Sequence, residues 1–181
     1  DVERSRGLGD VYKRQHQRDA FAQVVNFYGE KLYWQIRKMV LDHDDANDLL
    51  QNTFLKAWMN IDYFRGEAKL STWLYKIAIN ECITFLNRQR MQNNVSIDDT
   101  DVFLLECLKG DEYFDGDAAQ MKLQKAILTL PEKQRAVFNM KYFDDMKYED
   151  MSEIFGTSVG ALKASYHHAV KKVEEFLTKD I

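Results

Sequence analysis

The segment from Lys147 to Lys172 constrains the fold of this chain more than any other. It reads as a short amphipathic helix, a turn at Gly156, and a second helix that Thr157 or Ser158 can cap. Apolar residues recur at helical spacing on both sides of the turn. This is the spacing of a DNA-binding helix-turn-helix, so the segment predicts one, with its turn at Gly156.

The open face of the second helix is small and basic. The residues expected to pack inward are Val159, Leu162, Tyr166, Ala169, Val170 and Val173. The opposite face carries Gly160, Lys163, Ala164, His167, His168, Lys171 and Lys172, with no acidic residue before Glu174. Such a helix can enter a major groove and neutralise phosphates. Taken alone, the segment also fits an ordinary helical hairpin with a solvated basic face.

Composition supports a helical, reduced protein. One proline and 8 glycines in 181 residues favour helices over a turn-rich β fold. The two cysteines, Cys82 and Cys107, are far apart and have neither metal-ligand spacing nor the spacing of a disulfide framework. No apolar run is long enough to span a membrane, and no secretory signal pattern appears. We therefore expect a cytoplasmic location without membrane insertion.

Charge divides the chain into parts. The net charge is −4, which is unusual for a DNA-binding protein. Between Asn93 and Ala118, however, eight acids and the single base Lys109 give −7, which leaves +3 for the rest. Local charge decides phosphate contact, because salt screens charges beyond a Debye length of about 8–10 Å. We predict an all-α protein with helical domains at 16–92 and 119–181, the second a helix-turn-helix, joined by an acidic linker at 93–118. Residues 1–15, which lack useful periodicity, are interpreted as a non-native leader.

The first domain interleaves aromatic and basic residues. Helices are expected over 45–61 and from a cap at Ser71 or Thr72 to about residue 90, with a loop over 62–70. The loop and the following helix contain Tyr63, Phe64, Arg65, Lys69, Trp73, Tyr75, Lys76 and Asn80. Aromatic faces combined with positive charge hold single-stranded DNA. Two alternatives stay open: Trp73 at helical spacing also fits a core residue, and Phe64 also fits an anchor for the loop.

Four ordered passages resemble the sigma-70 family, specifically the extracytoplasmic-function (ECF) sigma factors. They are residues 45–58, residues 64–80, the Leu130-Pro131-Glu132-Lys133-Gln134-Arg135 sequence and the helix-turn-helix. The resemblance implies RNA polymerase contacts at Asp48, Gln51, Asn52 and Leu55. It implies contacts to the −10 element at Tyr63, Phe64, Arg65, Lys69, Trp73, Lys76, Asn80 and Arg88, where a flipped base would be captured. It implies contacts to the −35 element at Ser158, Gly160, Lys163, Ala164, His167, His168 and Lys171.

These observations predict a non-catalytic initiation factor without a cofactor. It would bind core bacterial RNA polymerase and direct promoter recognition and DNA melting, with an anti-sigma factor as a further partner implied by the resemblance. The alternative is a stand-alone helix-turn-helix regulator whose first domain binds a signal or dimerises, although such a regulator would not need residues 45–80. Residues 156–160 match the G-x-S-x-G nucleophile elbow, but that motif needs a preceding buried strand and the residues here are charged and helical. His167 and His168 are adjacent, so they cannot form a metal-binding pair one helical turn apart.

Overall fold

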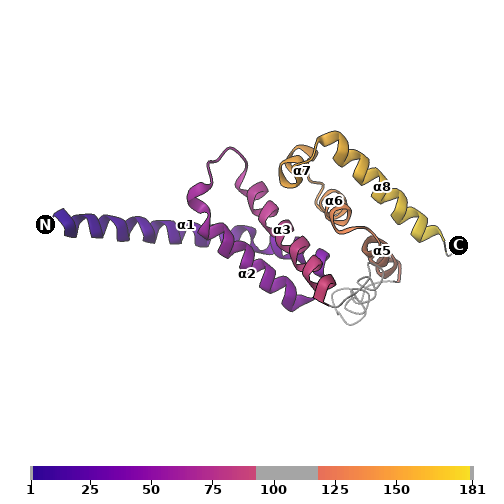
Figure 1. Cartoon of the computed structure of the whole chain (residues 1–181), viewed down its shortest axis with the longest axis horizontal. Helices are drawn as coiled ribbons and strands as arrows, with labels where there is room; N and C mark the ends of the chain where they lie inside the picture. The colour runs from indigo at the N-terminus through magenta and orange to yellow at the C-terminus, as the bar shows by residue number, and fades with distance from the viewer. Residues whose placement is uncertain (1, 93–117, 180–181) are drawn as a thin grey trace.

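A computed structural model describes residues 2–92 and 118–179, with side chains from Gln15 onward, and this part of the chain contains helices and no strand (Figure 1). The helices are α1 (Val2–Val40), α2 (His43–Met59), α3 (Leu70–Gln92), α5 (Ala118–Leu128), α6 (Glu132–Tyr142), α7 (Tyr148–Phe155) and α8 (Val159–Thr178), and a 3-10 turn, η1, covers Ile61–Tyr63. The predicted all-α class is confirmed. The acidic segment 93–117, with Cys107, lies outside the described residues.

The connection between α1 and α2 is a tight two-residue turn. Leu41 takes a left-handed conformation with φ 64°, which costs a non-glycine residue roughly 1–2 kcal/mol. Burial of its side chain, which is 1% exposed, offsets this cost. The Leu41 N–H donates to the carbonyl of Arg37 at 2.9 Å and ends α1, while the Asp42 carboxylate accepts from the N–H groups of Asp44 and Asp45 and caps α2. The chain therefore reverses direction while backbone groups at the end of α1 and the start of α2 keep hydrogen-bond partners.

The first domain packs α1, α2 and α3 around one core (Figure 1). Its buried apolar residues recur three or four positions apart, as amphipathic helices require. They include Leu32, Ile36 and Met39 from α1, Leu49, Phe54 and Ala57 from α2, and Leu74, Ala78, Ile79, Cys82 and Leu86 from α3. The predicted cap of α3 is wrong: the helix begins at Leu70, so Ser71 and Thr72 lie inside its first turn. Thr72 is buried against the core and not free to cap the helix.

The second domain packs α5, α6 and α8 around a smaller core. That core comprises Ala126, Ile127, Leu130, Phe138, Ala169 and Val173. Gly156 ends α7 with φ +62°, a conformation that glycine adopts without a side-chain penalty. The Ser158 hydroxyl accepts from the Ala161 N–H at 3.2 Å and caps α8. The predicted helix-turn-helix, its turn at Gly156 and a cap at Ser158 are thus confirmed.

The two domains are packed against each other. In Figure 1, α7 lies beside α3, and these two helices are in contact, as are α1 and α6. Buried residues of the second domain, including Val137, Met151 and Leu162, join the same apolar cluster as Ile36 and Leu74. None of the helices in the described ranges has the length and hydrophobicity to cross a bilayer.

Candidate nucleic-acid and protein interfaces

The outer face of α2 is polar with apolar side chains at its C-terminal end. Asp48, Gln51 and Asn52 are exposed, and Leu55 is 57% exposed while the opposite face of the helix is buried. Met59, one turn beyond Leu55, is 68% exposed and extends this face. Exposed aliphatic residues rimmed by polar ones are typical of a protein-docking surface. Sequence reasoning missed Met59, although its spacing of four from Leu55 was a usable signal.

The first turn of α2 is acidic, so negative charge lies at one end of this face. Burial, and then the neighbouring carboxylates of Asp42, Asp48 and Asp44, raise the pKa of Asp45. A shift with these causes reports a concentration of negative charge at the helix N-terminus, where the dipole partly compensates it. A basic surface would complement the charge at this end of α2.

The loop before α3 holds two adjacent aromatic residues in different environments. Tyr63, at the end of η1, is 79% exposed. Phe64 is half-buried, and its ring centroid lies 5.0 Å from that of Trp73 at a tilt of 35°. Gly66, with φ +71°, then turns the chain towards α3. Phe64 therefore anchors the loop on Trp73, whereas the Tyr63 ring is open to solvent.

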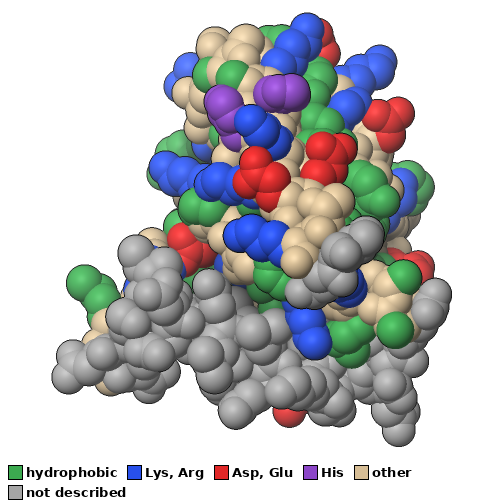
Figure 2. Space-filling view, turned by 90° about the vertical axis from the view of Figure 1, so that its right-hand side faces the viewer, with side chains coloured by type: hydrophobic (Ala, Val, Ile, Leu, Met, Phe, Trp, Pro, Cys, Tyr) green, Lys and Arg blue, Asp and Glu red, His purple; other side chains and the backbone are tan. Residues whose placement is uncertain are grey.

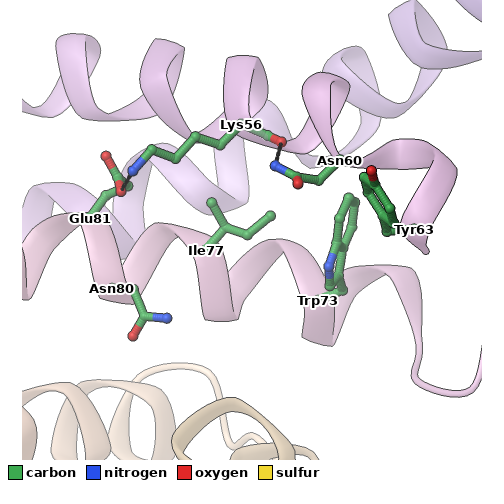
Figure 3. Close-up of a pocket in the computed structure, with 7 residues that line it drawn as sticks. All are labelled: Lys56, Asn60, Tyr63, Trp73, Ile77, Asn80 and Glu81. Carbon is green, nitrogen blue, oxygen red and sulfur yellow. Dashed lines mark hydrogen bonds and ion pairs between the residues drawn. The ribbon is translucent and has the colours of Figure 1, made fainter. Parts of the chain in front are cut away.

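A pocket of about 360 Å³ lies between α2 and α3 beside this loop (Figure 3). It is lined by Lys56, Asn60, Tyr63, Trp73, Ile77, Asn80 and Glu81. The rings of Tyr63 and Trp73 lie side by side at one end, an ion pair between Lys56 and Glu81 crosses the other, and the amide of Asn80 points away from the rings (Figure 3). An aromatic wall with polar groups around it suits a flat, hydrogen-bonding ligand such as a base.

The pocket unites three of the predicted −10 residues, Tyr63, Trp73 and Asn80, with residues that the sequence did not suggest. Asn60 is the C-cap of α2 and donates from its side chain to the carbonyl of Lys56 at 2.8 Å. Ile77 forms the apolar floor between the two helices (Figure 3). No local sequence signal marks these positions, because they become neighbours only when α2 packs on α3.

The four basic residues predicted for the −10 element do not line the pocket. Arg65, Lys76 and Arg88 are exposed. Lys69 is engaged: its Nζ lies 2.9 and 3.1 Å from the two carboxylate oxygens of Asp150 on α7. In this arrangement of the domains, Lys69 is held by an acid of the helix-turn-helix.

All seven residues predicted for the −35 element lie on the exposed face of α8 or at its cap. A Cβ at Gly160 would meet nothing within 4 Å, so packing does not require glycine there. Lys163 lies 5.7 Å from the Tyr148 ring, and the rings of His167 and His168 are 6.0 Å apart. Figure 2 shows histidine, lysine and arginine side chains gathered on the second domain, with acidic side chains among them. The face is small near its N-terminus and basic beyond it, which suits close approach to a groove.

Comparison with known proteins assigns the family. The profile of sigma-70 region 2 matches residues 24–91, and that of sigma-70 region 4 matches residues 120–173. The chain belongs to the sigma-70 family of RNA polymerase sigma factors, which bind the polymerase for promoter recognition. Within that family it is an ECF member, similar to the ECF RNA polymerase sigma factor SigW of Bacillus subtilis (strain 168), with 31% identity over 157 residues, or 82% of this chain and 84% of the relative.

Two further sigma factors are similar to this chain over about nine-tenths of its length. The RNA polymerase sigma factor SigV of the same organism is 27% identical over 168 residues, covering 93% of this chain and 97% of the relative. The sigma factor RpoE of Bartonella quintana, solved in complex with the anti-sigma factor NepR, has the same fold, with a TM-score of 0.67 and 24% identity over 90% of this chain and 99% of that one.

Proposed function

We propose that this sigma factor divides promoter recognition among three surfaces. The outer face of α2 docks on core RNA polymerase, the pocket between α2 and α3 captures an unstacked base of the −10 element, and α8 enters the major groove of the −35 element. The pocket, with exposed Tyr63 beside Trp73, is the observation that carries the proposal. The protein acts in the cytoplasm, where the polymerase works, and it has no catalytic activity of its own.

Binding energy drives the opening of the promoter in this proposal. Extruding a base from the duplex costs a few kcal/mol. Stacking on an aromatic side chain returns about 1–3 kcal/mol per base, so one or two captured bases offset most of that cost. The exposed cations Arg65, Lys76 and Arg88 would hold the backbone of the separated strand. No covalent chemistry is needed.

The −35 contacts are divided along α8. Residues near the N-terminus of a recognition helix reach base edges, whereas later ones meet the backbone. We therefore assign Lys163 and His167 to bases and Lys171 to phosphate. Ser158 contributes mainly by capping the helix, because its hydroxyl already accepts from the Ala161 N–H.

An anti-sigma factor belongs to the proposal as a partner. The argument is the resemblance of this chain to ECF sigma factors, together with its fold similarity to RpoE of Bartonella quintana, which is solved with such a protein. A stand-alone regulator is disfavoured, because residues 24–91 match sigma-70 region 2, which a helix-turn-helix regulator does not need.

Runoff transcription with core polymerase on a genomic fragment library tests the function, and a docking variant tests the α2 surface. Asp48→Ala with Gln51→Ala should weaken binding to core polymerase without changing helical content. The matched control is Asp19→Ala with Gln23→Ala, which removes the same two residue types from the exposed face of α1. Equal core affinity for the two double variants would exclude α2 as the docking face.

A further inference from the structure

The side-chain amide of Asn60 is held in one orientation at the edge of the pocket between α2 and α3. Its Nδ2 donates to the carbonyl of Lys56 at 2.8 Å, and the backbone N–H of Asn60 donates to the same carbonyl at 3.1 Å. A carbonyl oxygen accepts hydrogen bonds and cannot donate them, so the atom that meets it must be the amide nitrogen. The hydrogen bond that caps α2 therefore also fixes where the amide oxygen lies.

That oxygen is an acceptor on the pocket side of the amide. In Figure 3, the nitrogen of Asn60 meets the Lys56 carbonyl and the oxygen is turned towards α3. Asn60 lines the pocket together with Trp73 and Ile77 of the facing helix, and it is exposed, so a ligand can reach its oxygen. A polar group that is already oriented before the ligand arrives costs little to order on binding.

A second acceptor lies at the far end of the pocket. The carboxylate of Glu81 is paired with Lys56, and the Glu81 side chain is 15% exposed. One carboxylate oxygen meets the Nζ of Lys56, and a carboxylate has further lone pairs for another donor. The Lys56 charge balances the Glu81 charge, so the pocket gains an acceptor without a net negative charge that would repel DNA phosphates.

The wall of the pocket does not distinguish one base from another. Its volume of about 360 Å³ is near the lower end of the range of about 300–1,000 Å³ that small-molecule sites occupy. The rings of Tyr63 and Trp73 offer stacking, which tolerates any base because every base has a π-face. A preference among bases must therefore come from the hydrogen-bonding groups beside the rings.

Of these groups, the acceptors discriminate and the donors do not. Lys56 and the indole N–H of Trp73 can donate to a ring nitrogen or a carbonyl oxygen, and every base carries such an acceptor. Cytosine, adenine and guanine each carry an exocyclic amino group that can donate to Asn60 or Glu81, whereas thymine has none. The ring N–H of thymine lies between two carbonyl oxygens, which an acceptor oxygen of the pocket would repel.

We propose that Asn60 is a specificity-determining residue of this sigma factor. Its fixed amide oxygen, with the Glu81 carboxylate as a second acceptor, selects an unstacked base that carries an exocyclic amino group and rejects thymine. The inference rests on the function proposed above, because it requires that the pocket receives a base of the −10 element. It adds which bases are accepted, a property that the aromatic wall does not set.

Two pairs of bases test this selection by exchanging a single functional group. Methylation of cytosine at its thymine-like position gives a base with the ring and methyl group of thymine, but with an amino group in place of one carbonyl oxygen. Adenine and hypoxanthine form the corresponding purine pair. Each pair is placed in turn at every position of the non-template strand in a premelted −10 region, and the affinity of the RNA polymerase holoenzyme is measured for each template.

At one position, the parent protein should bind the amino member of a pair about 5- to 30-fold more tightly than the oxo member. Asn60→Leu keeps the size of the side chain but removes the acceptor, and it should lower this ratio to about threefold or less. Asn26→Leu, the same substitution on the exposed face of α1, should leave the ratio at the parent value. Each ratio compares two templates bound by one protein, so a loss of stability or of active protein cancels.

Two results would overturn the inference while base capture stands. One is equal affinity for the amino and oxo members at every position in a protein whose binding depends on Tyr63. The other is an unchanged ratio in Asn60→Leu, with both affinities lowered together, which would reduce Asn60 to a helix cap. If Tyr63→Ala instead binds every premelted template as tightly as Tyr63→Phe, the pocket does not receive a base, and the proposed function and this inference both fail.

Discussion

Replacing Tyr63 with alanine should impair promoter opening without destabilising the fold. The side chain is 79% exposed, so the free energy of unfolding should change by no more than about 0.5 kcal/mol. Loss of one stacking platform costs about 1–3 kcal/mol, which corresponds to a roughly 5- to 150-fold weaker affinity for the single-stranded −10 element. Tyr63→Phe keeps the ring and should behave like the parent protein.

Replacing the adjacent Phe64 with alanine should, by contrast, destabilise the fold. Its half-buried ring packs on Trp73, so Phe64→Ala should lose about half of the 3–5 kcal/mol that a fully buried phenylalanine contributes. In a protein of this size, a loss of about 2 kcal/mol lowers the melting temperature by about 4–8 °C. The loop would then lose its anchor, and DNA binding would fall together with stability.

Two measurements test this expectation. The first is the melting temperature of each variant. The second is the affinity of the RNA polymerase holoenzyme for a promoter identified by runoff transcription, offered either as duplex DNA or with the −10 region already melted. Tyr63→Ala should bind the premelted template more weakly than Tyr63→Phe at an unchanged melting temperature. The assignment of Tyr63 to base stacking and Phe64 to loop anchoring would be refuted by either of two results. One is an equal fall in melting temperature for Tyr63→Ala and Phe64→Ala, and the other is equal binding of the premelted template by Tyr63→Ala and Tyr63→Phe.

Three further outcomes follow from the structure. Gly160→Ala should raise the free energy of unfolding by up to about 1 kcal/mol in urea, because the new methyl group meets open space and alanine favours the helix. The same change should weaken −35 binding in a mobility-shift assay, and tighter binding would show that DNA does not approach Gly160. Lys171→Ala should weaken binding to all DNA sequences and lower the slope of log affinity against log salt concentration by about one. Lys163→Ala should instead change the −35 sequence that is selected, and the reverse pattern would show that α8 lies in the groove in the opposite orientation. Burial raises the pKa of Cys82, so in a Cys107→Ser protein at pH 8 iodoacetamide should label this thiol only after denaturation, and rapid labelling of the native protein would contradict its burial.

Local features were readable from the sequence because they depend on residues a few positions apart. Periodic apolar residues define the helices, Gly156 defines the turn, and Ser158 caps the helix that follows. The open face of α8 follows from the same periodicity. The cap of α3 was mispredicted, because burial of Thr72 against the core overrode its capping preference.

The tertiary structure decided what depends on residues distant in the chain. The sequence leaves open whether Phe64 binds DNA or anchors the loop, and only its packing on Trp73 separates this half-buried ring from the exposed ring of Tyr63. Lys69 reads as a free cation in sequence, but its partner Asp150 lies 81 positions away. The contact between the two domains includes a hydrogen bond from Arg135 Nη1 to the carbonyl of Met39, 96 positions away in the chain, and no periodic signal in the sequence predicts it. Such contacts arise from the shapes and charges of whole faces, which exist only after the helices have packed.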